Sequence, residues 1–557
     1  MKAFFQKYHR TLFYCGLLLL GLWQARYTEL QDDEAYYWVY SRFPDWGYFD
    51  HPPMIAMLIK AGYAIFPNEL GVRFFPLLMS IGWVVILEKL TERKNPFLFY
   101  AIILSIALIQ LGGYMAAPDT PLLFFTALFF LLLKKFGENG NLLNGSLMGA
   151  VMALMLYSKY HAVLVIFFAL IAQWRLLKKP ALWAGLFLAF LLFVPHLLWQ
   201  NHHDWVSVQY HLTENKVNDQ YKVGNTLNYI LAQLVLPGPF AGLILIPAAF
   251  LYKWKNGFQR SLYVTMTGFY LFFLLTTFRG KSEANWTSPA MVPLIVLSFF
   301  YLEEHLAWKK WMFRLLPLTL LLITFARFAM VFDFIPQKRL VFRFHTWKDW
   351  PKAMDKITAG RPVVFNNSYQ RASKYWFYTG RPTYSLNWYK WRMNNFNFWP
   401  LEDSVLGKPA YYLDIKNPFV MQDSIPYRQG FVEYRFDSCF ASYAKIDVKL
   451  LNEGNLRCNP GGMMQTTIRF DIPDHYAAFI RQHPPQNDTI RIGFFNGKTW
   501  LKDVITDLRL SQVNEKKEQT IRFSPGLPAG KYYMRFAINT GIYTPTHNSA
   551  KIDIVIE

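Results

Sequence analysis

Hydrophobic residues dominate the chain up to about residue 331, where they form long runs separated by short polar loops. A helix needs about 20 mostly apolar residues to cross a membrane, so several of these runs must extend into their flanks. The pattern predicts about eleven transmembrane helices, give or take about two. The runs lie at residues 12–24, 74–90, 97–112, 122–133, 142–157, 162–174, 182–199, 227–252, 262–278, 289–302 and 315–332.

Beyond residue 333 the pattern changes to shorter, more polar segments. Strand-like stretches at 363–366 and 411–414, with a helix-like stretch at 369–378 between them, predict a small mixed α/β domain. From about residue 442, alternating apolar and polar positions predict a β-sandwich-like domain. Its strands are expected at 444–451, 465–472, 489–495, 518–523, 531–539 and 550–556. We therefore expect three domains, at residues 1–335, 336–440 and 441–557.

The short loops orient the predicted helices. Basic pairs such as Lys134-Lys135 and Lys178-Lys179 fall on one side of the membrane, which the positive-inside rule assigns to the cytoplasm. The first run has no small-residue cleavage site before Arg26, so we expect an uncleaved helix with a cytoplasmic N-terminus. The opposite side then holds the loops at 27–73, 113–121, 158–161, 201–225 and 279–288, and everything after residue 333.

The first of these outer loops contains two short helical patterns, at 36–43 and 54–66. Both are too short to span a bilayer, so we expect them to lie in the membrane interface.

Composition agrees with a membrane part joined to a soluble part. The chain is 53% hydrophobic, yet its mean hydropathy is only +0.12. The net charge of +21 could indicate nucleic acid, but the basic residues follow the loops, so we expect no nucleic-acid partner. Whether Cys439 and Cys458 form a disulfide stays open, since pairing requires an oxidising compartment.

Two acidic positions on the outer side are candidates for chemistry. Asp32, Asp33 and Glu34 follow the first helix directly, and Asp119 lies between prolines at the outer end of another helix. A carboxylate close to the bilayer can act as a general base. The alternative for both positions is helix capping. Two carboxylates in separate outer loops favour one shared site.

Cations and polar side chains in the same loops could complete such a site. His51, Lys159, Arg279 and Lys281 are candidate phosphate ligands, with snorkelling toward lipid headgroups as the alternative. The pair His202-His203 could indicate a metal site, but no suitably spaced third ligand accompanies it. The expected lining of the cavity is Tyr36, Tyr37, Tyr160, His161, Asn201, Asn285 and Trp286.

Several motifs of other protein classes are missing. The sequence has no Walker loop, GxGxxG in a strand–helix context, GxSxG or HExxH, which argues against nucleotide-driven work. A secondary transporter and a non-catalytic envelope scaffold remain alternatives. Transporters tend to place ionisable groups mid-span within internal repeats, whereas here these groups cluster at helix ends.

The motifs resemble those of a known family. Asp-Glu-Ala-Tyr-Tyr at 33–37 and Asp-Trp-Gly-Tyr-Phe-Asp-His-Pro-Pro at 45–53 resemble the first outer loop of GT-C membrane glycosyltransferases. These are the bacterial enzymes related to protein O-mannosyltransferases and to the aminoarabinose transferases of lipid A. Further similarity lies at 117–121, 158–160, 195–201, 285–286, 369–373 and 391–395.

The resemblance implies an inverting sugar transfer from a polyprenyl-phosphate donor at the periplasmic face of a bacterial inner membrane. The acceptor would be a protein, lipid A or an envelope glycan. It further implies Asp33 as the base, Glu34 as its support, Asp119 as a second acid, and His51, Lys159 and Arg279 near the phosphate. No cofactor is expected to be required, and dependence on a divalent cation stays open.

Two departures from the family pattern stand out. Aminoarabinose transferases carry lysine where this chain has His51, which argues against that activity and implies a pH-sensitive phosphate contact. The tail after about residue 442 lies outside the resemblance.

Overall fold

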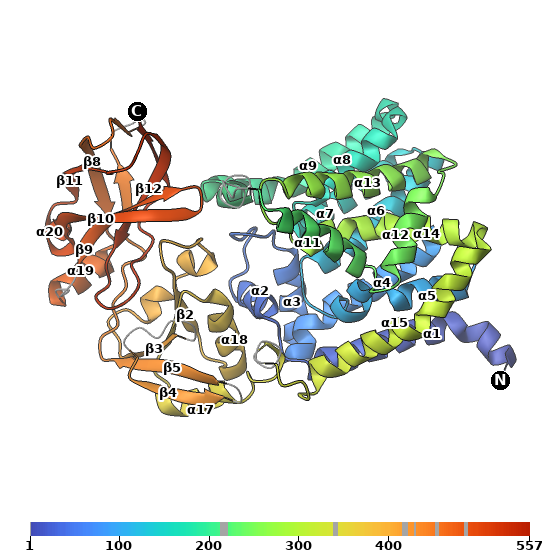
Figure 1. Ribbon diagram of the computed structural model, residues 1–557, viewed down its shortest axis with the longest axis horizontal. Helices are drawn as coiled ribbons and strands as arrows, with labels where there is room; N and C mark the ends of the chain where they lie inside the picture. Colours follow the sequence, from blue (N-terminus) through green and yellow to red (C-terminus); the bar gives the residue numbers. More distant parts are fainter. Residues whose placement is uncertain are drawn as a thin grey trace. The chain divides into compact units, whose positions relative to one another are not determined.

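The computed structural model describes residues 2–211, 221–337, 343–414, 421–427, 430–451, 456–483 and 488–557. The chain divides into two compact units. The helical unit holds residues 1–211 and 220–345, and the strand-rich unit holds residues 346–557 (Figure 1).

The helical unit begins with two helices, followed by the loop between Arg42 and Met54. All its further elements are also helices. Its elements are α1 (Lys2–Tyr27), α2 (Asp32–Arg42), α3 (Met54–Ile65), α4 (Glu69–Leu90), α5 (Pro96–Ser105), η1 (Leu108–Gly112), α6 (Asp119–Glu138), α7 (Leu142–Ser158), α8 (Ala162–Ala172), η2 (Trp174–Lys178), α9 (Pro180–His202), α10 (Val206–Gln209), α11 (Val223–Val235), α12 (Gly242–Leu251), α13 (Gly257–Thr276), η4 (Ala284–Ala290), α14 (Met291–Glu304) and α15 (Leu306–Val331).

Among the described residues, five helical segments are long and apolar enough to cross a membrane. They are Glu69–Leu90, Asp119–Glu138, Pro180–His202, Ala284–Glu304 and Leu306–Val331. Shorter apolar helices lie between them. Every predicted run coincides with a helix or a pair of helices, so the multi-pass helical character is confirmed, while the count of eleven spans stays a prediction.

Two predicted runs are each broken into two helices. The run at 227–252 contains Pro237-Gly238-Pro239, and these prolines cannot continue the hydrogen bonding of α11 into α12. Gly238 has a φ of +120°, and a Cβ there would lie 2.1 Å from the carbonyl oxygen of Ser105. Ser105 ends α5, where the other run breaks, and Leu108 N–H donates to Leu236 O at 3.2 Å. The two breaks therefore pack against each other.

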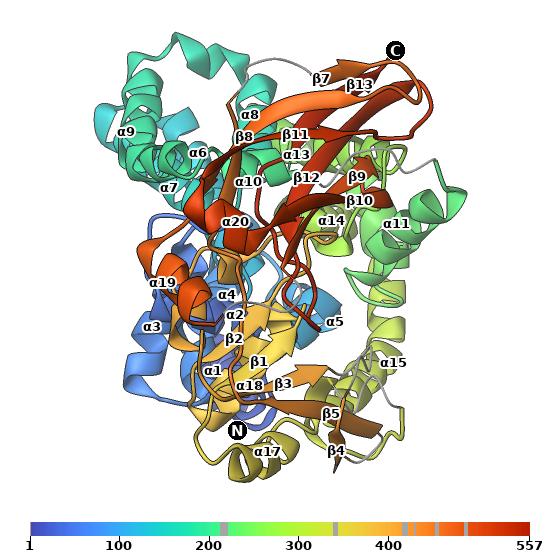
Figure 2. The ribbon, with the colours of Figure 1, turned by 90° about the vertical axis from the view of Figure 1, so that its left-hand side faces the viewer.

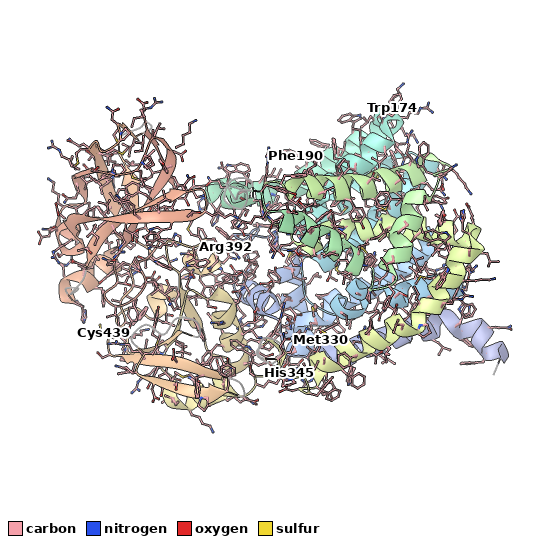
Figure 3. The ribbon with its side chains drawn as sticks, viewed as in Figure 1. Trp174, Phe190, Met330, His345, Arg392 and Cys439 are labelled. Atoms are coloured by element: carbon pink, nitrogen blue, oxygen red, sulfur yellow. The ribbon has the colours of Figure 1, made fainter. Side chains whose placement is uncertain are left out.

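Small residues allow α7 and α9 to approach closely. A Cβ on Gly149 would lie 2.0 Å from the carbonyl oxygen of Gly185, so neither helix could keep its position with a larger residue there. The outer face of α9 is apolar and exposed: Phe190 is 58% exposed, and Figure 3 shows it on the surface of the helical unit. This is the pattern of a lipid-facing helix.

The strand-rich unit starts with a five-stranded sheet of order β2-β1-β3-β5-β4. β1 pairs in parallel with β2 and β3, and β5 is antiparallel to β3 and β4. This first part consists of α17 (Trp350–Thr358), β1 (Val363–Asn366), α18 (Tyr369–Thr379), β2 (Thr383–Leu386), η5 (Asn395–Asn397), η6 (Glu402–Ser404), β3 (Ala410–Asp414), β4 (Asp423–Tyr427) and β5 (Gly430–Asp437).

The remainder of this unit forms two sheets, of orders β10-β9-β12-β13-β7 and β11-β8-β6. Figure 2 shows β9, β10 and β12 side by side. Phe470 from one sheet and Phe494 from the other belong to one buried core. The elements are β6 (Asp447–Leu450), β7 (Leu456–Cys458), β8 (Met464–Asp471), α19 (Asp474–Gln482), β9 (Thr489–Asn496), β10 (Thr499–Arg509), α20 (Leu510–Glu515), β11 (Glu518–Phe523), β12 (Gly530–Ile538) and β13 (Ile552–Ile556).

The strand-rich character of the C-terminal part is thus confirmed. The sequence pattern missed α17, β2, β4 and β5 in the first part of this unit, and β7, β10, α19 and α20 in the remainder. The boundary expected at residue 440 stays a prediction. Cys439 and Cys458 are both free thiols, so the disulfide left open by the sequence is not formed.

Candidate active site

The N-terminus of α2 separates Asp33 from Glu34. Gln31 caps the helix, with its backbone N–H donating to Glu34 Oε2 at 2.9 Å in a capping box. Glu34 is buried, whereas Asp33, one residue earlier, is exposed. Gln31 and Glu34 thus supply the capping contacts, and Asp33 lies at an exposed position of the same turn.

Glu34 is held by donors from three segments. Arg73 Nε donates to its Oε1 at 2.7 Å and Arg73 Nη2 to its Oε2 at 2.5 Å. The backbone N–H of Ala116 donates to Oε1 at 2.8 Å. With both oxygens occupied, Glu34 joins α2 to α4 and to the loop just before Asp119. The loop that presents Asp119 thus lies beside the helix turn that presents Asp33.

Asp119 is the centre of a second buried cluster. Lys159 Nζ donates to both of its oxygens, at 2.9 and 3.0 Å. Asn285 Nδ2 donates to Oδ2 at 3.0 Å and Ser288 Oγ to Oδ1 at 2.6 Å. Asp119 begins α6, Lys159 caps the end of α7, and the other two lie in η4. Three segments that are distant in sequence therefore meet at one carboxylate.

His51 lies in the electrostatic reach of this cluster. Burial lowers the pKa of its side chain to about 4, and the charges of Asp50, Lys159, His211 and Asp119 modify that shift. Its Nδ1 is buried without a hydrogen-bond partner among the described residues. His51 is consequently neutral at pH 7, and the pH-sensitive phosphate contact expected at this position stays a prediction.

A chain of hydrogen bonds runs from Tyr160 to α9. Gln200 Nε2 donates to the Tyr160 hydroxyl at 2.9 Å, and that hydroxyl lies 3.1 Å from His196 Nε2. His196 Nδ1 lies 2.7 Å from the carbonyl oxygen of Trp46, which can only accept. Nδ1 therefore carries a proton, and in the neutral imidazole Nε2 accepts from Tyr160. Gln200 Oε1 is buried with no partner in the described structure.

The tyrosines of α2 are packed inside the helical unit. Tyr36 and Tyr37 are buried. Tyr37 meets the His51 ring edge-on, with centroids 5.5 Å apart. Next along the helix, the Tyr40 hydroxyl donates to Asp50 Oδ1 and its ring stacks on Tyr48 at 4.0 Å. These contacts fix the loop that carries His51 against α2.

The remaining predicted residues lie outside the Asp119 cluster or at its edge. The ring of His161 packs against Trp286, with centroids 6.0 Å apart. Asn201 is exposed at the end of α9. Arg279 is exposed, and Lys281 pairs with Glu283 at 2.9 Å on the surface. The described residues include no group of three or more His, Cys, Asp or Glu side chains that could hold a metal ion.

Sequence reasoning missed Arg73 and Ser288, whereas His196 and Gln200 lie in the similarity at 195–201 and Gln200 was a possible cavity residue. Arg73 carried a weak signal, because an arginine in a loop predicted to be on the outer side departs from the positive-inside pattern, although Arg42 and Arg279 share that property. Ser288 carried none, since serine occurs commonly in such segments.

Known proteins share this arrangement of elements and parts of the sequence. Residues 50–199 match the family described as dolichyl-phosphate-mannose-protein mannosyltransferase. The lipid A galacturonosyltransferase RgtD of Rhizobium johnstonii is 24% identical over 301 residues, which cover 51% of this chain and 62% of that protein. The matched part is therefore less than two thirds of that relative.

Two solved structures share the fold. ArnT from Cupriavidus metallidurans in the apo state superposes with a TM-score of 0.56 over 77% of this chain and 98% of its own, at 12% identity. ArnT bound to undecaprenyl phosphate gives 0.54, over 76% and 97% of the two chains, also at 12%. The chain thus has an ArnT-like fold, with a helical membrane part followed by a strand-rich part. The predicted resemblance to PMT-like GT-C glycosyltransferases is confirmed.

Proposed function

We propose that this chain is an inverting glycosyltransferase that moves a sugar from a polyprenyl-phosphate donor to an acceptor at the periplasmic face of the inner membrane. One observation carries the proposal: buried Asp119 and Lys159 and the exposed Asn285, from three separate helix ends, form one hydrogen-bonded cluster next to the turn that exposes Asp33. Such an arrangement can place a general base, a cation that binds the donor phosphate and polar groups that contact the sugar at one membrane surface.

Asp33 is the proposed base. Both oxygens of Glu34 already accept hydrogen bonds from Arg73 and from backbone N–H groups, so Glu34 acts by positioning. Asp119 is similarly occupied by Lys159 and Ser288. An accessible carboxylate can take a proton from an acceptor hydroxyl, and of these three only Asp33 is exposed.

In the proposed step, the acceptor oxygen attacks the anomeric carbon of the sugar. The bond from that carbon to the phosphate oxygen breaks, and its electron pair leaves with the lipid phosphate. The acceptor proton passes to Asp33. Attack opposite the leaving group inverts the anomeric configuration, and no nucleotide is needed because the phosphate ester is already activated.

The departing phosphate is assigned to Lys159 and His51. An ammonium has three N–H donors, and two of those on Lys159 point to Asp119, which leaves one for a ligand. A neutral His51 can add an N–H donor from its unpartnered ring nitrogen. Arg279 and Lys281 are proposed as outer contacts, consistent with their exposure. Tyr160, His161, Asn201, Asn285 and Trp286 are proposed to line the sugar and acceptor space, backed by Tyr36 and Tyr37.

A lipid is the favoured acceptor, because the relative identified above is named a lipid A galacturonosyltransferase. An undecaprenyl-phosphate carrier is the favoured donor lipid, because a structure of the same fold binds undecaprenyl phosphate. Mass spectrometry of lipid A and envelope glycans from a deletion strain would identify the sugar and the acceptor.

The central test incubates the purified protein with polyprenyl-phosphate sugars and measures release of the lipid phosphate. Removing a general base typically slows a reaction by about 10²–10⁴-fold, so we expect a loss of that size in Asp33→Asn. Asp32→Asn is the matched control, one residue away on the same helix turn, and should keep near wild-type turnover. Full activity in Asp33→Asn would reject the assigned base. Solute flux into proteoliposomes without any sugar transfer would reject the function itself.

A further inference from the structure

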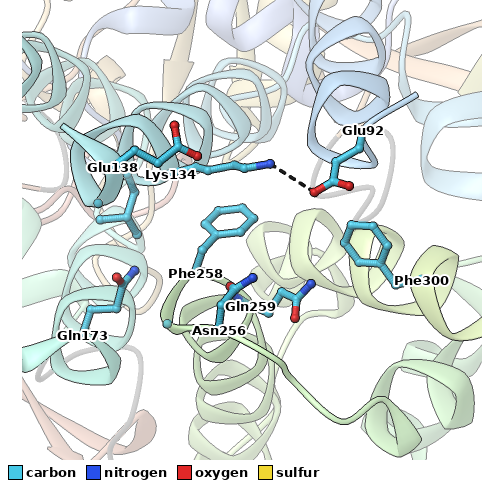
Figure 4. A pocket seen from close by; sticks show the side chains of 11 residues that line it. Glu92, Lys134, Glu138, Gln173, Asn256, Phe258, Gln259 and Phe300 are labelled. Carbon is cyan, nitrogen blue, oxygen red and sulfur yellow. Dashed lines mark hydrogen bonds and ion pairs between the residues drawn. The ribbon is translucent and has the colours of Figure 1, made fainter. Parts of the chain in front are cut away.

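A cavity of about 340 Å³, lined by both polar and apolar residues, lies at the opposite end of α6 from Asp119 (Figure 4). α6 has 20 residues, which at 1.5 Å per residue separates its two ends by about 28 Å. That distance is close to the roughly 30 Å thickness of a bilayer core. The cavity therefore opens at the other membrane interface, far from the proposed chemistry. Its lining residues are Glu92, Leu133, Lys134, Gly137, Glu138, Gln173, Asn256, Gly257, Phe258, Gln259 and Phe300.

Two helix termini of opposite polarity face this cavity. Glu138 is the last residue of α6, where the helix dipole is negative, and it has no hydrogen bond or ion pair among the described residues. Gly257 begins α13, where the dipole is positive. The Asn256 side chain caps Gln259 N–H at 2.9 Å, so the N–H groups of Gly257 and Phe258 remain for a ligand. Cations are favoured at the first terminus and anions at the second.

Two charged side chains of α6, Lys134 and Glu138, lie one helical turn apart in the lining. Lys134 Nζ lies 3.3 Å from Glu92 Oε1, and Lys94 Nζ lies 2.8 Å from Glu92 Oε2. Glu92 is thus neutralised by two ammonium groups, while the Glu138 carboxylate is not. Figure 4 shows Lys134 directed toward Glu92, with Phe258 and Asn256 across the cavity. α6 contributes both the Glu138 carboxylate and the Lys134 ammonium, and the start of α13 contributes backbone donors.

We propose that this cavity binds the headgroup of a zwitterionic ethanolamine phosphodiester, with phosphatidylethanolamine of the adjacent leaflet as its source. The ligand ammonium would pair with Glu138 at the end of α6. Its phosphate would lie against the start of α13 and Lys134. The position at a membrane interface favours a lipid over a soluble compound, and the apolar walls of Phe258 and Phe300 suit the glycerol region. The inference does not depend on the proposed glycosyl transfer.

Gly137 lines the cavity and provides a site where a side chain can be added without a clash. A Cβ at this position meets no atom within 4 Å, so Gly137→Leu projects into open space. Gly16 on α1 has the same property and lies in another helix, which makes Gly16→Leu the matched control. For the charge, Glu138→Gln is compared with Glu304→Gln, which alters an exposed carboxylate outside the lining.

The test measures the melting temperature of the purified full-length protein in detergent with added phosphatidylethanolamine, phosphatidylcholine or phosphatidylglycerol of identical acyl chains. We expect phosphatidylethanolamine to give the largest rise. Gly137→Leu should lose this rise in melting temperature, and Gly16→Leu should keep it. Glu138→Gln should respond equally to phosphatidylethanolamine and phosphatidylcholine. Glu304→Gln should still prefer phosphatidylethanolamine. Soluble glycerophosphoethanolamine tests the source: a full shift from it would overturn the lipid assignment.

Two results would overturn the site itself. One is an unchanged phosphatidylethanolamine effect in Gly137→Leu. The other is an equal or larger shift from phosphatidylglycerol in the wild type, because an anionic headgroup has no ammonium for Glu138.

Discussion

Arg73 holds Glu34 with two hydrogen bonds, and both side chains are shielded from solvent, with exposed fractions of 0% and 3%. Arg73 also donates to the backbone carbonyls of Ala25, Thr28 and Glu29. One guanidinium therefore fixes the end of α1, the start of α2 and, through Glu34, the loop that leads to Asp119.

Breaking this pair should destabilise the protein strongly. Removing one partner of a buried ion pair typically costs about 3–5 kcal/mol, because the other charge remains buried. We expect Arg73→Met and Glu34→Ala to lower the free energy of unfolding by that amount in denaturation assays of the purified protein. Lys281→Met breaks the exposed Lys281–Glu283 pair and should cost less than about 1 kcal/mol. A small effect for Arg73→Met would contradict a structural role for the pair.

Lys159 and Asp119 should show strong energetic coupling. Each single change leaves a charged group among buried neighbours, whereas the double change Lys159→Met with Asp119→Leu removes both charges. Groups in direct contact typically couple by about 0.5–3 kcal/mol. The double variant should therefore lose less free energy of unfolding than the two single variants lose together. Arg279→Gln, which alters an exposed side chain, serves as the comparison for activity and should reduce turnover far less than Lys159→Met. Additive stability losses would argue against the contact.

Stability should depend on pH through His51. Its pKa is lowered from 6.5 to about 4 in the folded protein. Between these values the unfolded chain binds more protons, so the free energy of unfolding should fall as the pH decreases from about 6.5 toward about 4. Melting curves at several pH values should show a weaker dependence in His51→Gln than in the wild type. Above pH 7 the two dependences should coincide, and a difference confined to alkaline pH would refute the assignment.

The close approach of α7 and α9 should tolerate no side chain. In Gly149→Ala the added Cβ would lie 2.0 Å from the Gly185 carbonyl oxygen, so the helices must separate. Overpacking of this kind typically costs about 1–3 kcal/mol. Gly16→Ala adds the same methyl group in open space and should be neutral or slightly stabilising. Equal melting temperatures for the two variants would mean that the helices are farther apart than described.

The Tyr160 hydroxyl offers a subtler test. It lies between Gln200 and His196, so Tyr160→Phe leaves two buried polar groups without this partner. An unsatisfied buried group typically costs about 1–3 kcal/mol. We expect reduced thermal stability together with a higher KM, since Gln200 would reorient in the space proposed for the substrate. Tyr157→Phe, which removes a partly exposed hydroxyl bonded to Leu192 O, should change stability less and leave KM unaltered.

The helices could be predicted from sequence because their signal is local. Each apolar run predicts a helix from its own residues alone. The break between α11 and α12 is also local, because Pro237-Gly238-Pro239 interrupts the run. The missed strand β10 shows the converse. Its inward and outward positions do not alternate cleanly, because its pairing with β9 contains two irregularities in register.

The candidate site was predictable only in part. Asp119, Lys159 and Asn285 could be proposed together because each lies at an outer helix end, a property that topology assigns. Ser288 could not, since its bond to Asp119 joins residues 169 positions apart. The separate roles of Asp33 and Glu34 also required the structure: the two neighbours differ in exposure, which adjacency in sequence does not reveal.

The place of Asp119 at the first position of α6 has a consequence for an anionic substrate. The positive end of a helix dipole acts on the carboxylate from one side, and the Lys159 ammonium bonds it from the other. Its negative charge is therefore offset by two independent sources. The carboxylate at the centre of the cluster should therefore repel an approaching phosphate less than an isolated carboxylate would.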